Sequence, residues 1–150
     1  MGVINEMRLD FLSCPANEAF ARMVISAFVL PLNPTLEQLG DIKTSVSEAV
    51  TNAVVHGYGE RGGTIRMKAA ITEQGELTVE VIDNGCGIRD IREARQPFFT
   101  TMEASERSGM GFTVMESFMD DVQVFSEPGR GTTVRMSKQI VAPKQLAREA

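Results

Sequence analysis

The sequence contains only two cysteines and a single histidine. Cys14 and Cys86 lie far apart, no CxxC pair occurs, and His56 alone cannot complete a zinc-ligand set, so no structural zinc site is expected. GxSxG and HExxH motifs are also absent, and no cysteine and histidine form a plausible nucleophile and base. Covalent hydrolase chemistry is therefore disfavoured, and Cys86, between two glycines, is interpreted as a small side chain that a turn tolerates.

An excess of positive charge and long apolar runs are missing as well. The net charge is -5, whereas contacts to nucleic-acid phosphates are made chiefly by Lys and Arg. The longest strongly apolar run, residues 23–32, is interrupted by Ser26 and Pro31 and is too short to span a bilayer. The N-terminus lacks the basic start and apolar core of a signal peptide. We expect a cytoplasmic protein that contacts neither nucleic acid nor a membrane directly.

What is present is the composition of a globular domain. The 150 residues are 43% hydrophobic and 23% charged, which suits one domain with a real core. We expect residues 1–140 to form this single domain. The segment 141–150 shows no core pattern and is expected to fray.

Apolar periodicity and turn residues predict a strand, two helices, a hairpin, a third helix and a second hairpin. Asn17 is expected to cap the first helix, and Thr35 with Gln38 resembles a capping box for the second. Paired strands, instead of strands alternating strictly with helices, predict an α+β fold: a two-layer α/β sandwich with a mostly antiparallel, mixed sheet and helices on one face. The expected strands are 4–11, 64–72, 77–82, 122–126 and 131–137, and the expected helices are 19–28, 36–54 and 112–119.

Residues 89–108 are charged and polar, with no apolar period beyond Phe98 and Phe99. A loop of this length inside a compact domain is usually either a functional lid or disordered. Because glycine motifs flank it on both sides, we expect a lid over a ligand site.

One polar stripe follows the second helix. Asp41, Ser45, Glu48 and Asn52 are spaced by four, three and four residues and share a helix face. Taken alone, such a stripe is more often a solvated face. With the glycine loops downstream, Asn52 would give a carboxamide oxygen to Mg²⁺, and Glu48 would act as a general base for attack on a terminal phosphate. His56 extends the stripe, with packing or helix capping as its simpler role.

Two glycine motifs flank the lid. Asp83 ends a strand, and its acceptor-only carboxylate would take a hydrogen bond from an adenine amino group, with Gly85 and Gly87 clearing space for the ring. A simple Asn-Gly turn is the alternative. Residues 109–111 open a helix whose N-terminal amides suit phosphate oxygens. No GxxxxGK[ST] occurs, so Arg107 is the nearest cation for a terminal phosphate, unless it is only a solvated arginine.

Together these segments resemble the GHKL superfamily of ATP-binding domains, which includes histidine kinases and gyrase. The short chain and the run 47–58 are most similar to the anti-sigma factor serine kinases, in particular those of sporulation. This resemblance implies the GHKL, or Bergerat, fold with an ATP lid. The matching segments are 48–53 for the N box, 83–88 for the G1 box, 97–101 for the F box, 109–112 for the G2 box and 131–133 for a late Gly-Thr element.

The resemblance also implies a role for each matching position. Glu48 would activate a serine hydroxyl, Asn52 would bind Mg²⁺, Asp83 would read adenine, and Arg107 would meet the terminal phosphate. The other positions would line the ATP site around the base, under the lid and along the phosphates: Gly85, Gly87, Thr101, Ser108, Gly109, Met110, Gly111 and Thr132.

Partners follow from the resemblance alone. Such proteins are homodimers that hold a sigma factor away from RNA polymerase, and they use Mg-ATP to phosphorylate a serine of an anti-anti-sigma protein. Arg22, the only cation of the first helix, is a candidate partner contact, although a surface arginine with a packed stem also accounts for it.

Two alternatives stay open. A pure binding module would hold ATP as a structural ligand and only sequester a partner. A histidine-kinase-like ATPase would need a dimerising helical hairpin with a phosphoacceptor histidine, and a gyrase-type ATPase would need a second domain. We expect this length to leave no room for either addition.

Overall fold

One antiparallel sheet forms a complete layer of the molecule. The computed structural model describes residues 2–88, 95 and 111–140. Within them, five strands in the order β1-β2-β3-β5-β4 form antiparallel pairs. Their bounds are Val3–Leu12 for β1, Thr64–Thr72 for β2, Glu76–Asp83 for β3, Asp121–Glu127 for β4 and Gly131–Gln139 for β5.

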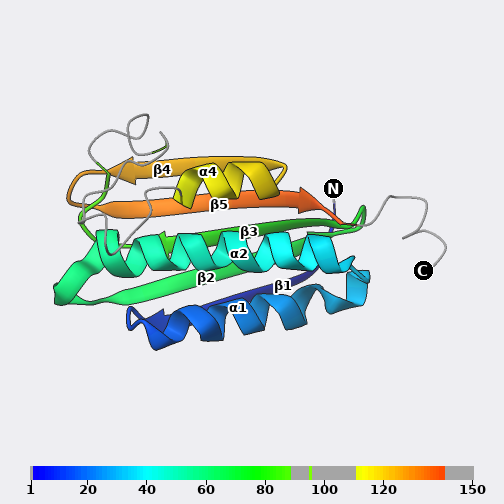
Figure 1. Cartoon of the computed structure of the whole chain (residues 1–150), viewed down its shortest axis with the longest axis horizontal. Helices are drawn as coiled ribbons and strands as arrows, with labels where there is room; N and C mark the ends of the chain where they lie inside the picture. Colours follow the sequence, from blue (N-terminus) through cyan, green and yellow to red (C-terminus); the bar gives the residue numbers. More distant parts are fainter. Residues whose placement is uncertain (1, 89–94, 96–110, 141–150) are drawn as a thin grey trace.

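Helices cover one face of this sheet, which confirms the two-layer α+β sandwich (Figure 1). Helix α1 (Ala16–Val29) contacts β2, α2 (Leu36–Asn52) contacts β3, and α4 (Gly111–Phe118) contacts β4. Helix α2 lies between the other two and packs against both. It is therefore the central helix of the layer.

Alternation along the strands explains why only one face is covered. In β2, Ile65 and Met67 are fully buried beneath the helices, while Arg66 and Lys68, which alternate with them, are exposed. The same period of two directs alternate side chains of β3 and β5 into the core, where they are mostly hydrophobic, and the residues between them to the open face, where they are mostly polar. The core lies between the sheet and the three helices.

Helix α2 begins as the sequence predicts but ends differently. The Thr35 hydroxyl accepts a hydrogen bond from the Gln38 amide at 3.0 Å, and the Gln38 side chain accepts one from the Thr35 amide at 3.0 Å. This capping box is confirmed. After Asn52 the backbone changes to a π-helix, η2 (Ala53–Tyr58), and then to a 3₁₀ turn, η3 (Gly59–Arg61).

The expectation that Asn17 caps the first helix is wrong. Helix α1 already begins at Ala16, directly after Pro15, and the Asn17 side chain instead donates a hydrogen bond to the Leu12 carbonyl at 2.9 Å. Proline has a backbone angle that suits the start of a helix, so the chain enters the helix before Asn17. At its other end, α1 passes into a 3₁₀ turn, η1 (Leu30–Leu32), that contains Pro31.

Two predicted segments fall outside the described residues. They are the lid at 89–108, apart from Arg95, and the tail at 141–150. Across 2–88, 95 and 111–140, every helix is too short or too polar to cross a membrane.

Candidate functional site

A row of polar side chains crosses the ends of three neighbouring strands. Asp83 of β3 lies opposite Thr132 of β5, which lies opposite Ser126 of β4. The Ser126 hydroxyl lies 2.8 Å from the Thr132 hydroxyl, donates to the Gly131 carbonyl at 3.0 Å and accepts from the Ile88 amide at 2.7 Å. Sequence reasoning missed Ser126, which only the register of the second hairpin brings into this row.

The loop after β3 is held tightly against the end of the central helix. The Cys86 amide donates to the Gly57 carbonyl at 2.8 Å, and the Cys86 thiol donates to the His56 carbonyl at 3.0 Å. A Cβ added at Gly85 would overlap the backbone of Gly57, and one added at Gly57 would lie 2.8 Å from Asp83 Oδ1. Both glycines are therefore required by close approach of two chain segments.

Gly87 is required for a related reason. Its φ of 76° is one that side chains with a Cβ rarely adopt, and an added Cβ would overlap the Glu127 carbonyl at the β4–β5 turn. The sequence predicts Gly85 and Gly87 as space for a ligand ring. In the structure, the nearest neighbours of both positions belong to the protein backbone.

The Asp83 carboxyl is buried at the centre of this arrangement, with 5% of its residue surface exposed. Its Oδ1 accepts a hydrogen bond from the Gly85 amide at 2.9 Å. Burial raises the pKa of Asp83 above its ordinary value, and hydrogen bonds from the backbone amides of Gly85 and Thr132 oppose that rise. An ionised carboxylate at this buried position therefore lowers the free energy of unfolding.

The polar stripe on α2 is not a uniformly solvated face. Asp41 lies 3.6 Å from the ammonium of Lys138, and Ser45 is fully buried with no hydrogen-bond partner for its hydroxyl among the described residues. Glu48 and Asn52 are half-buried. Because α4 packs along α2, part of the stripe is covered by protein.

Asn52 occupies a distinctive position, at the last residue of α2 before the π-helix. Such π-turns inside helices are frequent at functional sites. The π-helix brings Gly57 against the loop after β3. It also brings Tyr58 next to Asn84, whose amide donates a hydrogen bond to the Tyr58 hydroxyl at 2.8 Å. The sequence predicted a helix that continues past this point, because the apolar period does not change there.

The structure places only some of the predicted site residues. Asp83, Gly85, Gly87 and Thr132 meet at one end of the sheet, Glu48 and Asn52 lie on α2, and Gly111 is the buried first residue of α4. The remaining predicted positions lie outside the described residues: Thr101, Arg107, Ser108, Gly109 and Met110.

Arg22 lies on α1, with 41% of its side chain exposed. Its guanidinium is 3.7 Å from the Glu18 carboxylate, which also accepts a hydrogen bond from the Ser47 hydroxyl of α2. Phe20 and Met23, on the same helix, are 48% and 64% exposed. Arg22 is thus linked through Glu18 to Ser47, the residue that precedes Glu48.

A hollow of about 580 Å³ lies across the ends of β3, β4 and β5. Its lining includes Asp83 and Thr132 but also Ile82, Phe125 and Thr133, which belong to the face of the sheet opposite the core. It is therefore not the space between the sheet and α2.

The chain is similar to proteins of one family. Residues 11–138 match the family described as histidine kinase-like ATPase domain. The chain is 54% identical to the anti-sigma F factor of Thermoanaerobacter sp. strain X514, over 96% of this chain and 100% of that protein. It is 53% identical to the anti-sigma F factor of Geobacillus kaustophilus, over 95% of this chain and 97% of that protein.

Solved structures agree on the fold. The RsbU and RsbW domains of a Mycobacterium tuberculosis protein superpose with a TM-score of 0.66 at 19% identity, over 91% of this chain and 32% of that one. Full-length ShkA, solved in complex with AMPPNP, gives a TM-score of 0.57 at 16% identity, over 85% of this chain and 30% of that one. The catalytic domain of the histidine kinase ThkA gives a TM-score of 0.57 at 16% identity, over 93% of this chain and 99% of that one.

We expect Gly85→Ala to destabilise the fold because its new methyl group would overlap the backbone of Gly57. A shift of this kind in a packed region typically costs about 1–3 kcal/mol. Gly40→Ala is the matched control: its site on α2 is exposed and open, so the same change should stabilise the chain by up to about 1 kcal/mol. Urea unfolding of both variants checks this, and equal stability of G85A and wild type would show that the loop does not press on Gly57.

Asp83→Asn should stabilise the unliganded fold at neutral pH. Because burial raises the pKa of Asp83 in the folded state, the ionised carboxylate destabilises the fold. This destabilisation is absent below the unfolded-state pKa of about 3.9 and grows as pH rises toward the folded-state pKa. The stability gain of D83N should therefore be near zero at low pH and increase with pH. Unfolding free energies measured across this pH range provide the test.

Asp10→Asn supplies a control of opposite sign. The hydrogen bond from Arg66, at 2.8 Å, lowers the pKa of Asp10, so its contribution is present above the unfolded pKa and is lost as pH falls through the folded value. D10N should therefore lose stability at neutral pH and approach wild type in acid. A D83N curve that parallels the D10N curve would contradict the burial of an ionised Asp83.

Proposed function

The chain belongs to the histidine kinase-like ATPase domain family and, within it, groups with the anti-sigma F factors, and we propose that it is an anti-sigma factor with serine kinase activity. In this proposal it binds and inhibits a sporulation sigma factor in the cytoplasm. It uses Mg-ATP to phosphorylate a serine of an anti-anti-sigma protein. The observation that carries the nucleotide part is the buried Asp83 carboxylate at the end of β3.

Asp83 would recognise adenine through its amino group. A carboxylate only accepts hydrogen bonds, and Gly85 already occupies Oδ1 from one side, so the remaining acceptor positions suit a donor such as the adenine N–H. The Thr132 hydroxyl, fixed beside it by Ser126, would add a contact near the base. The tight loop around Gly85 and Gly87 would hold these groups in place.

The two central elements would handle the phosphates. Mg²⁺ favours oxygen ligands and usually keeps waters and phosphate oxygens around it, so one carboxamide oxygen from Asn52 fits its chemistry. Gly111 begins α4, whose N-terminal amides and dipole favour phosphate oxygens. Arg107, outside the described residues, is proposed to meet the terminal phosphate.

Glu48 would be the base of the transfer step. It would accept the proton of the serine hydroxyl while the serine oxygen bonds to the γ-phosphorus and the bond to the leaving ADP oxygen breaks. Its place one helical turn before Asn52 supports this role, because both side chains then lie on the same face of α2.

Helix α1 would contribute to partner binding. The helix carries Arg22 and the exposed Phe20 and Met23, and arginine, aromatic and methionine side chains are enriched in protein interfaces. We propose Arg22 as a contact to the sigma factor or the anti-anti-sigma protein. The functional unit is proposed to be a homodimer.

A nucleotide-binding module that sequesters its partner without catalysis is the second candidate. It would bind the nucleotide through the same residues, including Asp83, and differs only in whether Glu48 accepts a proton. The two functions are separated by one substitution.

Glu48→Gln should keep ATP binding and lose phosphate transfer, because the amide retains the shape of the side chain but cannot act as a base. General bases typically contribute about 10²–10⁴-fold to a rate. Transfer from radiolabelled ATP to a copurified candidate protein is measured alongside ATP binding. Glu37→Gln, at an exposed glutamate in the first turn of the same helix, is the matched control and should transfer at the wild-type rate. Equal transfer by E48Q would rule out Glu48 as the base and favour another group.

A further inference from the structure

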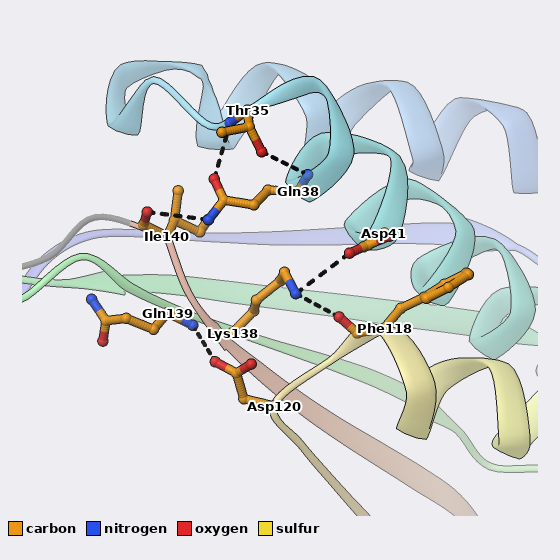
Figure 2. A network of polar contacts seen from close by, with 8 residues as sticks. All are labelled: Thr35, Gln38, Asp41, Phe118, Asp120, Lys138, Gln139 and Ile140. Carbon is orange, nitrogen blue, oxygen red and sulfur yellow. Dashed lines mark hydrogen bonds and ion pairs between the residues drawn. The ribbon is translucent and has the colours of Figure 1, made fainter.

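Lys138 is a nearly buried lysine at the end of the molecule opposite Asp83. It lies near the end of β5, opposite Leu77 in the ladder and therefore on the helix-covered face. Only 13% of its side chain is exposed. Its ammonium donates a hydrogen bond to the Phe118 carbonyl at 2.6 Å and lies 3.6 Å from the Asp41 carboxylate (Figure 2).

The first of these contacts holds the end of α4. Phe118 is the last residue of that helix, so its carbonyl has no partner in a following turn and carries partial negative charge from the helix dipole. The chain just beyond is fastened to the same strand: the Asp120 amide donates to the Ser137 carbonyl at 2.9 Å, and the Gln139 amide donates to the Asp120 carboxylate at 2.7 Å. The C-terminal end of α4 is thus anchored on β5.

The second contact ties the same ammonium to the central helix. Asp41 belongs to the stripe of α2 that also contains Glu48 and Asn52. Helices α2 and α4 run in opposite directions, so Lys138 joins the start of α2 to the end of α4 (Figure 1). The other ends of the two helices carry Asn52 and Gly111.

We propose that Lys138 is a positioning residue that sets α4 along α2 and thereby places Gly111 relative to Glu48 and Asn52. Helix α4 has only eight residues, so it behaves as one rigid piece, and a shift at Phe118 is passed to Gly111. That shift would change the contacts to the phosphate groups of a bound nucleotide, whereas it would not change the contacts to a base held by Asp83. The inference rests on the proposed nucleotide function.

A purely structural role makes a different prediction. A buried ion pair is weak evidence for stability, and its replacement by apolar side chains of similar volume is often neutral or stabilising. If Lys138 only stabilised the fold, its removal would change unfolding but would leave the relative affinity for phosphate and base unaltered.

The test compares the dissociation constants of Mg-ATP and adenosine, obtained by competition with a fluorescent ATP analogue. Lys138→Met keeps the length of the side chain and removes both contacts. We expect it to weaken Mg-ATP by about tenfold, since small displacements of binding groups have effects of this size or larger. Adenosine should change by no more than about twofold, as expected for a distant independent site.

The double variant K138M/D41L separates positioning from misfolding and from a change in net charge. It leaves no unpaired, partly buried carboxylate, so it should fold even if K138M does not, and it keeps the net charge of the wild type. The same loss of Mg-ATP affinity relative to adenosine is expected. Gln38→Ala is the control, because it removes the hydrogen bond at 3.4 Å from α2 to the Ile140 carbonyl and the capping-box hydrogen bond from the Thr35 amide but does not touch α4. The ratio of the dissociation constants of Mg-ATP and adenosine for Q38A should equal that of the wild type.

The outcomes separate the inference from the proposed function. If the wild type bound neither Mg-ATP nor adenosine, the nucleotide function itself would be wrong. If the wild type bound Mg-ATP more tightly than adenosine and the double variant kept the same ratio, Lys138 would have no positioning role, whatever its effect on thermal stability.

Discussion

The contact between the loop after β3 and the backbone of Gly57 determines the geometry of the whole site. A Cβ at Gly85 would overlap the backbone of Gly57, one at Gly57 would meet the Asp83 carboxylate, and the Cys86 amide donates a hydrogen bond to the Gly57 carbonyl at 2.8 Å. The end of α2 and the end of β3 are thereby fixed to each other. Asn52 on the helix and Asp83 on the strand depend on this junction for their relative positions.

The junction also explains why a carboxylate can stay buried there. Little of Asp83 is exposed to solvent, and its pKa is raised because burial disfavours the ionised carboxylate. Backbone amides of Gly85 and Thr132 offset part of the cost, but neither carries a full positive charge. Buried, perturbed groups of this kind are concentrated at functional sites, where stability is sacrificed for a preorganised contact. In the proposed function, a donor from a ligand would add a further hydrogen bond to this carboxylate.

The sequence alone predicts most of the framework, since strand alternation, two hairpins and the Thr35–Gln38 capping box are local signals. It also singles out Asp83, because a strand followed by Asn-Gly has few interpretations. Sequence reasoning failed where distant segments decide the outcome. The π-turn after Asn52 keeps the apolar period of a helix, and Ser126 gains its partners only through strand register.

Burial of the polar stripe was another feature beyond local prediction. The spacing of Asp41 and Ser45 is that of a solvated face, but in the structure Asp41 pairs with Lys138 and Ser45 is fully buried. Asp83 and Lys138 lie at opposite ends of the sheet, and in the proposals above each end has a separate role. Because a helix transmits displacement along its axis, groups at the second end can influence a site at the first.

The claim that Asp83 reads an adenine amino group is tested most directly by thermal unfolding with saturating Mg-ATP and, separately, Mg-GTP. Guanine presents a carbonyl oxygen where adenine presents its amino group, so the acceptor-only carboxylate should favour ATP. A ligand at 100 times its dissociation constant adds about 2.7 kcal/mol of stability. The account predicts a stabilisation of this size with Mg-ATP and a much smaller one with Mg-GTP. Equal stabilisation by the two nucleotides, or none by either, would contradict it.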